Sequence, residues 1–103
     1  MKTEWFVKVT AECERQLDEL IRRNKFSEDD ARVIRAWTQL VIEHGPEILK
    51  TQPSVWADHA LEGEWEGHRA SSYSYSGRII YSVHEKIVTV KVVRITPDHN
   101  YRK

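Results

Sequence analysis

The first half of the chain changes from a short apolar run to apolar positions at helical spacing. Residues 4–9 are β-branched and aromatic over a short span, which is typical of a strand. Apolar residues then recur three or four positions apart from Cys13 to Ile21, and Thr10 precedes them as a candidate N-cap. The pattern predicts a strand followed by an amphipathic helix that ends at about Asn24.

A second helix is predicted after a short connection. Ser27 begins a capping box and is followed by three acidic residues at the positive end of the helix dipole. The apolar stripe of this helix includes Trp37, which is expected in the core, and Gly45 with Pro46 ends it. Residues 47–65 have a mixed pattern, for which only a further helical turn and a loop are expected.

From residue 68 onward the apolar positions alternate with polar ones, which predicts strands. Three strands are expected, at 68–75, 78–84 and 87–96, joined by two-residue turns at Ser76-Gly77 and Glu85-Lys86. The expected order is β-α-α-β-β-β in a single α+β domain over residues 1–103. An antiparallel meander forms its second half, and the first strand is expected to join the sheet. The helical hairpin should cover one face and leave the other face for function.

Charge is distributed unevenly although the net charge is zero. Residues 1–66 contain 9 Lys or Arg against 14 Asp or Glu, and residues 67–103 contain 7 against 2. Such polarity suits a protein that presents one basic face to phosphates, although acidic helices beside basic strands would give the same numbers. A lone Cys13 excludes an internal disulfide, and neither an export signal nor a membrane span is expected, so the cytoplasm is the expected location.

Three motifs in the second half carry a resemblance to a known family. Residues 58–69, Asp-His-Ala-Leu-Glu-Gly-Glu-Trp-Glu-Gly-His-Arg, resemble the D-H-x-L-x-G-x-W-x-G-x-R block of YafQ-like toxins. Residues 76–83 are similar to a strand found across RelE and ParE relatives, and residues 93–101 are similar to their closing strand and C-terminal stub. The chain therefore resembles the RelE/ParE toxin superfamily, most of all YafQ- and RelE-like mRNA interferases of type II toxin–antitoxin systems.

This resemblance implies a RelE-like fold, a cognate antitoxin in a possible hetero-oligomer, and cleavage of mRNA in the ribosomal A site. It also implies a reaction without metal or cofactor, in which a ribose 2′-OH attacks the adjacent phosphate. Such a reaction needs a base, an acid and cations for the pentavalent phosphate. Histidine suits proton transfer near neutral pH, and arginine can hold two phosphate oxygens at once.

Two arginines are candidates for the phosphate. By alternation, Arg78 shares a face with Ile80, and the opposite set with Ile79 and Tyr81 is the better core. A turn at Ser76-Gly77 would bring Arg69 to the same sheet region as Arg78. The alternative for Arg78 is a solvated residue at the end of a strand.

The proton-transfer candidates come from the resemblance. His99 aligns with a closing catalytic histidine and His59 with another active-site histidine, and Asp58 would orient or charge His59. Tyr101, two residues after His99, could stack on a base or assist proton transfer. The alternatives are a capping loop histidine for His59 and a C-terminal anchor for Tyr101.

Three further residues are candidates for binding RNA. Arg94 could contact a phosphate or pair with Glu85 across the sheet. Tyr73 and Tyr75 could stack on exposed bases, as aromatic residues do in readers of single-stranded RNA, or could be ordinary strand residues.

The sequence departs from the YafQ pattern at two positions, where Ser72 and Ser76 replace a histidine and an aspartate. This departure keeps two alternatives open beside the endonuclease. One is a ParE-like inhibitor of DNA gyrase, and the other is a non-catalytic regulatory binding module of the same fold. No compact spacing of metal ligands is present, so no metal is expected.

Overall fold

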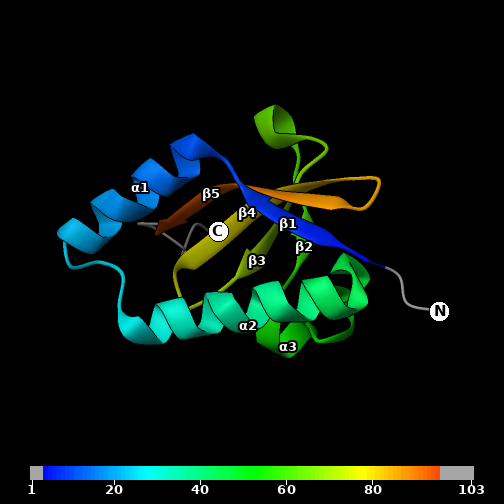
Figure 1. The fold of residues 1–103 in the computed structure, drawn as a ribbon, viewed down its shortest axis with the longest axis horizontal. Coiled ribbons are helices and arrows are strands. Elements are labelled where there is room, and N and C mark those ends of the chain that lie inside the picture. The colour runs from blue at the N-terminus through cyan, green and yellow to red at the C-terminus, as the bar shows by residue number, and fades with distance from the viewer. Residues whose placement is uncertain (1–3, 96–103) are drawn as a thin grey trace.

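The computed structural model describes residues 4–95, and Figure 1 shows their arrangement. The strand β1 (Phe6–Val9) leads into the helices α1 (Ala11–Arg22) and α2 (Glu28–His44). Four short elements follow: η1 (Pro46–Thr51), α3 (Pro53–Trp56), β2 (His59–Ala60) and η2 (Gly63–Trp65). The described chain then forms the strands β3 (Arg69–Ser72), β4 (Gly77–His84) and β5 (Ile87–Ile95).

The strands form one mixed sheet with the order β1-β5-β4-β3-β2. β1 runs parallel to β5, with Phe6 opposite Ile87, and all other neighbours are antiparallel. The predicted α+β class is confirmed, as are the meander and the addition of the first strand to it. The two-residue strand β2 was not predicted, and it adds a fifth strand to the sheet. Within residues 4–95, no helix has the length and apolarity needed to cross a bilayer.

Side-chain caps determine where both long helices begin. Thr10 Oγ1 accepts a hydrogen bond from the amide of Cys13 at 3.0 Å. Ser27 Oγ accepts one from the amide of Asp30 at 3.0 Å, and the Asp30 carboxylate accepts one from the amide of Ser27 at 2.9 Å. Both predicted N-termini are therefore confirmed. α1 ends at Arg22, two residues earlier than predicted, and Asn24 has a left-handed φ of 62° that would not continue the helix.

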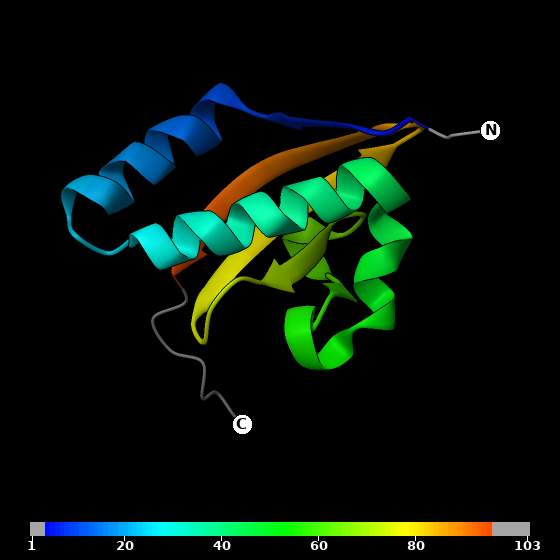
Figure 2. The ribbon, with the colours of Figure 1, turned by 60° about the horizontal axis from the view of Figure 1, so that its bottom comes forward.

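Both helices pack on the same face of the sheet, and Figure 2 shows α2 lying across the strands. Cys13 of α1 and Trp37 of α2 are completely buried there, which confirms the predicted core position of Trp37. Burial raises the pKa of the Cys13 thiol, and a hydrogen bond from the backbone of Val93 opposes this only in part. The strands and the turn after β3 contribute a row of inward side chains to this core: Tyr73, Ile79, Tyr81, Val88, Val90 and Val93.

The opposite face carries a second, smaller cluster. Ala70, Ile80 and Val92 are buried beneath Leu61 and Trp65, which belong to the segment around η2. This face was expected to be open along its whole length, and that expectation is wrong over these three residues. Leu61 and Trp65 lie in the region of mixed pattern, so alternation within the strands could not show that they fold back onto the sheet.

A bulge in β5 changes which residues face the helices. Ile80 pairs with Val92 but Tyr81 pairs with Val90, so Lys91 is an extra residue in β5. A bulge of this kind interrupts the alternation of side chains along one strand. As a result Val90 and Val93 both join the helix-side core, and Arg94 lies on the opposite face with Val92.

The turn between β3 and β4 also differs from the prediction. It spans Tyr73–Ser76, where the amide of Tyr73 donates to Gly77 O at 3.1 Å and the amide of Gly77 donates to Ser74 Oγ at 2.9 Å. β4 begins at Gly77, where a Cβ atom would lie 2.4 Å from the ring of Tyr73. The longer turn makes Ser72 the partner of Arg78. By contrast, the turn at Glu85-Lys86 is confirmed.

Candidate functional site

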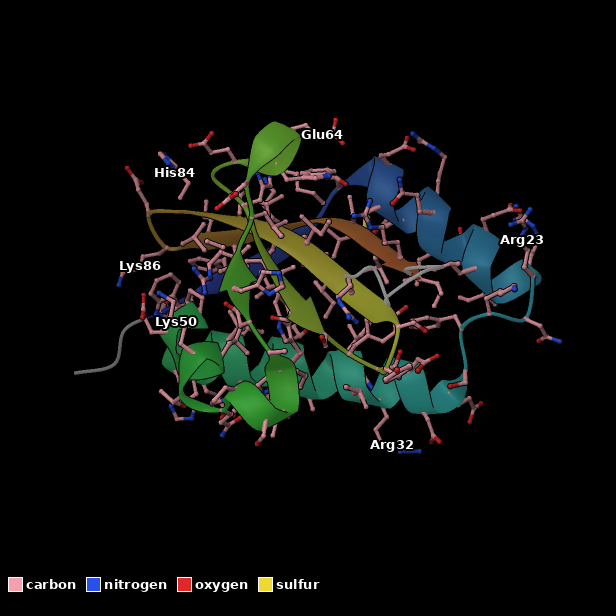
Figure 3. The ribbon with its side chains drawn as sticks, turned by 180° about the vertical axis from the view of Figure 1, so that it is seen from behind. Arg23, Arg32, Lys50, Glu64, His84 and Lys86 are labelled. Atoms are coloured by element: carbon pink, nitrogen blue, oxygen red, sulfur yellow. The ribbon has the colours of Figure 1, made fainter. Side chains whose placement is uncertain are left out.

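Two arginines lie directly opposite each other on the face that the long helices leave free. Arg78 of β4 pairs with Arg94 of β5, on the same face as Ile80 and Val92. Figure 3 shows this side of the molecule, where β4 and β5 cross the centre, the segment that carries Glu64 lies above them and α1, which leads to Arg23, lies to the right. Like charges directly opposite each other destabilise a sheet, so this pair costs stability unless an anion lies between its members.

The turn before β4 holds the guanidinium of Arg78. Its Nη1 donates to Gly77 O at 2.9 Å, to Tyr75 O at 3.2 Å and, at the limit of hydrogen bonding, to Ser74 O at 3.5 Å. Within residues 4–95, no carboxylate lies within 4.0 Å of Arg78 or Arg94. Tyr75, whose backbone carbonyl accepts one of these hydrogen bonds, is 82% exposed. The arrangement can bind a phosphate, and Tyr75 adds an exposed aromatic residue to the same turn.

Replacing Arg94 by glutamate is expected to stabilise the fold by about 0.5 kcal/mol, because repulsion across the strands becomes attraction. Urea unfolding of the purified chain measures the difference. Lys8→Glu, at an exposed position of β1 that pairs with Thr89, supplies the same change of charge opposite a neutral residue. Equal effects of the two substitutions would show that Arg78 and Arg94 do not repel each other.

His59 lies on the same face as the arginine pair, on the edge strand β2. It pairs with Ala70, which pairs with Ile80, so these three side chains share one face. Standard strand spacings place the Cα atoms of His59 and Arg78 about 12 Å apart, within the combined reach of their side chains around one phosphate. Nδ1 of the exposed His59 lies 2.9 Å from Ala57 O. Because a carbonyl can only accept, this contact is a hydrogen bond only when Nδ1 carries the proton, and in the neutral imidazole that leaves the lone pair on Nε2.

Arg69 does not join Arg78, and the prediction that the two share a sheet region is wrong. Arg69 pairs with Tyr81 and lies on the helix side of the sheet, where its Nε donates to Asp58 Oδ1 at 2.7 Å. A two-residue turn would have paired Arg69 with a residue on the Arg78 face. The longer turn shifts the register by an odd number of residues and reverses the face of every β3 side chain.

The Asp58 carboxylate makes no hydrogen bond to His59, so the expectation that it orients or charges the imidazole by direct contact is wrong. Its fully buried side chain accepts hydrogen bonds from Arg69, from Ser71 Oγ at 2.6 Å and from the Tyr81 hydroxyl. Trp37 Nε1 donates to Ser71 Oγ at 3.0 Å and connects α2 to this network. Asp58 therefore joins the loop before β2 to two strands and one helix.

The network keeps its donors protonated. Burial alone would lower the pKa of Arg69, but hydrogen bonding and charge attraction from Asp58 outweigh it and the pKa is raised. Burial, followed by the hydrogen bond to Asp58 and its charge, raises the pKa of Tyr81 far above its ordinary value. Both side chains remain donors throughout the physiological range, which favours a structural role for Arg69 over a catalytic one.

Tyr73 is a core residue, and the prediction that it stacks on RNA bases is wrong. Its side chain is buried and packs on Phe26 with ring centroids 5.8 Å apart. Burial, with a contribution from the charge of Asp30, raises its pKa to about 12 against the opposing effect of Arg78. The same register shift explains this error, because Tyr73 was expected on an open strand.

The remaining candidates are placed as follows. Arg94 lies opposite Arg78, whereas Glu85 is in the turn at the other end of β4, so the alternative ion pair between Arg94 and Glu85 is wrong. Ser72 faces the site beside Arg78, and Ser76 lies in the turn. His99 and Tyr101 lie outside the described residues, so their roles stay predictions.

A groove of about 1010 Å³ adjoins Arg94 between α1 and β5. Trp65, Val92 and Leu20 contribute apolar surface to it. Five of its lining residues are basic and two are acidic: Arg15, Arg23, Lys25, Lys91 and Arg94 against Glu12 and Glu19. The sequence analysis missed Lys91 and Trp65. Lys91 is a basic residue between apolar strand positions, and Trp65 is a tryptophan in an acidic loop. These features could have drawn attention to both residues, but neither shows on which face of the sheet the side chain lies.

No metal site was predicted, and among residues 4–95 no three or more His, Cys, Asp or Glu side chains gather as a candidate cluster.

Comparison with known structures gives this architecture a context. The structure of YafQ from E. coli strain BL21(DE3) matches with a TM-score of 0.70 and 17% identity, over 89% of this chain and 93% of that one. RelE in the RelE–RelB complex from Pyrococcus horikoshii OT3 matches with a TM-score of 0.66 and 16% identity, over 93% and 99%. The chain has the RelE-like toxin fold.

A third match extends the RelE-like likeness to another toxin–antitoxin pair. The YoeB–YefM complex from Staphylococcus aureus matches with a TM-score of 0.63 and 10% identity, over 96% of this chain and 100% of that one. No model of a protein family matches the sequence, and no curated protein does. At these identities the likeness establishes the fold, and the chemistry has to be argued from the side chains.

Proposed function

We propose that this RelE-like chain is the toxin of a type II toxin–antitoxin system and an endoribonuclease that cuts mRNA in the ribosomal A site. The observation that carries the proposal is the Arg78–Arg94 pair on the free face, which has no carboxylate within 4.0 Å among residues 4–95. Two arginines that pair on adjacent strands suit the additional negative charge of a pentavalent phosphate. Their mutual repulsion would be relieved when a phosphate binds between them.

The remaining roles follow from the chemistry of RNA cleavage by its own 2′-OH. His59 is the base, because its Nε2 lone pair is available to accept the 2′-OH proton. His99 is the acid that protonates the departing 5′-oxygen, and Tyr101 assists it or stacks on a base. Tyr75 is exposed beside Arg78 and would stack on a neighbouring base. These groups need no metal ion for the reaction.

The groove between α1 and β5 supports a path for the RNA strand beyond the cleaved bond. Its basic excess suits phosphates, and Trp65 offers a ring for stacking. The proposal includes a cognate antitoxin that covers this surface, as the DinJ–YafQ and RelE–RelB pairs are solved as complexes. It also implies a hetero-oligomer and a cytoplasmic location, where translating ribosomes are found.

One observation favours a second candidate, a ParE-like inhibitor of DNA gyrase. Ser72 lies opposite Arg78 at a position where the resemblance leads one to expect a histidine. A serine there supplies no base, so proton transfer would depend on His59, His99 and Tyr101.

The deciding experiment expresses the wild-type chain and an Arg78→Ala/His99→Ala variant in bacteria, and maps growth together with mRNA 5′ ends. For the wild type we expect growth arrest and new mRNA 5′ ends. For the variant we expect neither. Arrest by the double variant would overturn this mechanism. Induction of the SOS response and double-strand breaks with intact mRNA would select the gyrase target, and harmless expression would favour a binding module.

A further inference from the structure

Asp58 and His59 are neighbours in the chain, but their side chains lie on opposite faces of the sheet. The Asp58 carboxylate is buried on the helix side among Arg69, Ser71 and Tyr81. Since successive residues of an extended segment point to opposite sides, burying Asp58 obliges His59 to face the Arg78–Arg94 surface.

The peptide group between Ala57 and Asp58 connects the buried network to the imidazole. Ala57 has a left-handed backbone conformation, with φ 49° and ψ 38°, which costs energy in a residue other than glycine. Three donors to Asp58 offset this cost and hold the peptide plane. The carbonyl of that same peptide, Ala57 O, accepts the hydrogen bond from Nδ1 of His59. The carboxylate therefore acts on the imidazole through the backbone without touching it.

We propose that Asp58 is a positioning residue that selects the Nδ1-protonated tautomer of His59, so that the Nε2 lone pair faces the Arg78–Arg94 surface. Free imidazole side chains favour the other tautomer, in which Nε2 carries the proton and cannot accept one. The use of this lone pair in catalysis rests on the proposed function, but the selection of the tautomer does not.

The test is the tautomer of His59 in the ¹⁵N-histidine-labelled full chain at about pH 8.5, where free imidazole is neutral. Two-bond ¹H–¹⁵N correlations distinguish protonated Nδ1 from protonated Nε2, and His59→Gln identifies the signal. The wild type is expected to show protonated Nδ1. Asp58→Asn, which keeps the shape but loses the charge that accepts three hydrogen bonds, should reduce the ratio of the two tautomers by about fivefold.

Two further variants separate positioning from loss of stability. Val41→Ala removes buried volume from α2 and should leave the His59 signal unchanged. Tyr81→Phe removes one donor to Asp58 and keeps the carboxylate, so it should shift the tautomer ratio in the same direction, and it decides the matter if Asp58→Asn does not fold. Protonated Nε2 in the wild type, an unchanged ratio in folded Asp58→Asn, or an equal shift in Val41→Ala would each overturn the proposal. Absence of RNA cleavage by the wild-type chain would contradict the proposed function and leave the selection of the tautomer standing.

Discussion

Replacing Arg78 and Arg94 together by alanine is expected to slow RNA cleavage by at least about 10³-fold. One hydrogen-bond donor to a charge that develops in a transition state contributes on the order of 10²- to 10³-fold, and each guanidinium offers several donors. Because the two side chains would hold the same phosphate, each single substitution should already remove most of the activity. Cleavage of mRNA on programmed ribosomes, with purified variants at saturating concentration, measures the loss.

The matched control replaces Arg32 and Lys50 by alanine. These cations are exposed, lie outside the paired strands and form ion pairs within their own helices, so their removal should leave cleavage within about twofold. A cleavage rate in the Arg78/Arg94 variant equal to that of the control would show that the cation pair does not act on the scissile phosphate.

The largest loss of stability is expected for Asp58→Ala, which should reduce the free energy of unfolding by about 3–5 kcal/mol. The Asp58 side chain is fully buried and that of Arg69 is 26% exposed, so removing the carboxylate leaves a largely desolvated charge uncompensated, and two further donors, Ser71 and Tyr81, lose their acceptor as well. Denaturant unfolding monitored by tryptophan fluorescence measures the loss. Trp37 donates a hydrogen bond to Ser71 and would report the change in its surroundings.

Adding Arg69→Met to Asp58→Ala should restore part of this stability, because it removes the charge that the first substitution leaves unpaired. Glu64→Ala, at an exposed position near Asp58 in the chain, should change stability by less than about 0.5 kcal/mol. If Asp58→Ala behaves like Glu64→Ala, the hydrogen bonds to Asp58 contribute little to the fold.

Helix boundaries and strand identities could be predicted from the sequence because local chemistry determines them. The capping box at Ser27, the glycine after His44 and the alternation in β4 and β5 act within a few residues of each other. The segment between α2 and β3 could not be predicted in the same way. Its elements are only two to six residues long, and contacts with distant strands stabilise them.

Most of the errors at the candidate site come from the turn before β4. Assigning it two residues at Ser76-Gly77 reversed the expected face of β3, and with it the placement of Arg69 and Tyr73. The four-residue turn is stabilised by the ring of Tyr73, which packs on Phe26 and passes over Gly77. That contact joins residues 26, 73 and 77, so no pattern within the strand indicates it.

Arg78 was expected on the functional face and Arg94 was a candidate for binding RNA, but their pairing depends on the bulge at Lys91. Strict alternation places Val90, Val92 and Arg94 on one side of β5, whereas Val90 lies in the helix-side core. Lys91, the extra residue, allows Val90 to lie on the helix side while Val92 and Arg94 lie on the other. The pattern of residues in β5 shows no interruption at Lys91, so the bulge could not be predicted. The sequence could thus indicate both arginines as candidates for binding phosphate, but it could not indicate that they pair across β4 and β5.

The position of β5 in the sheet has a consequence for synthesis of the chain. β5 lies between β1 and β4, so the earliest strand obtains its only strand neighbour among residues 4–95 from the one that is translated after all the others. Pairing over such a long separation in sequence is slow to form. A nascent chain that lacks β5 has neither a closed core nor Arg94, so the Arg78–Arg94 pair, on which the proposed cleavage depends, can form only after β5 has emerged and folded.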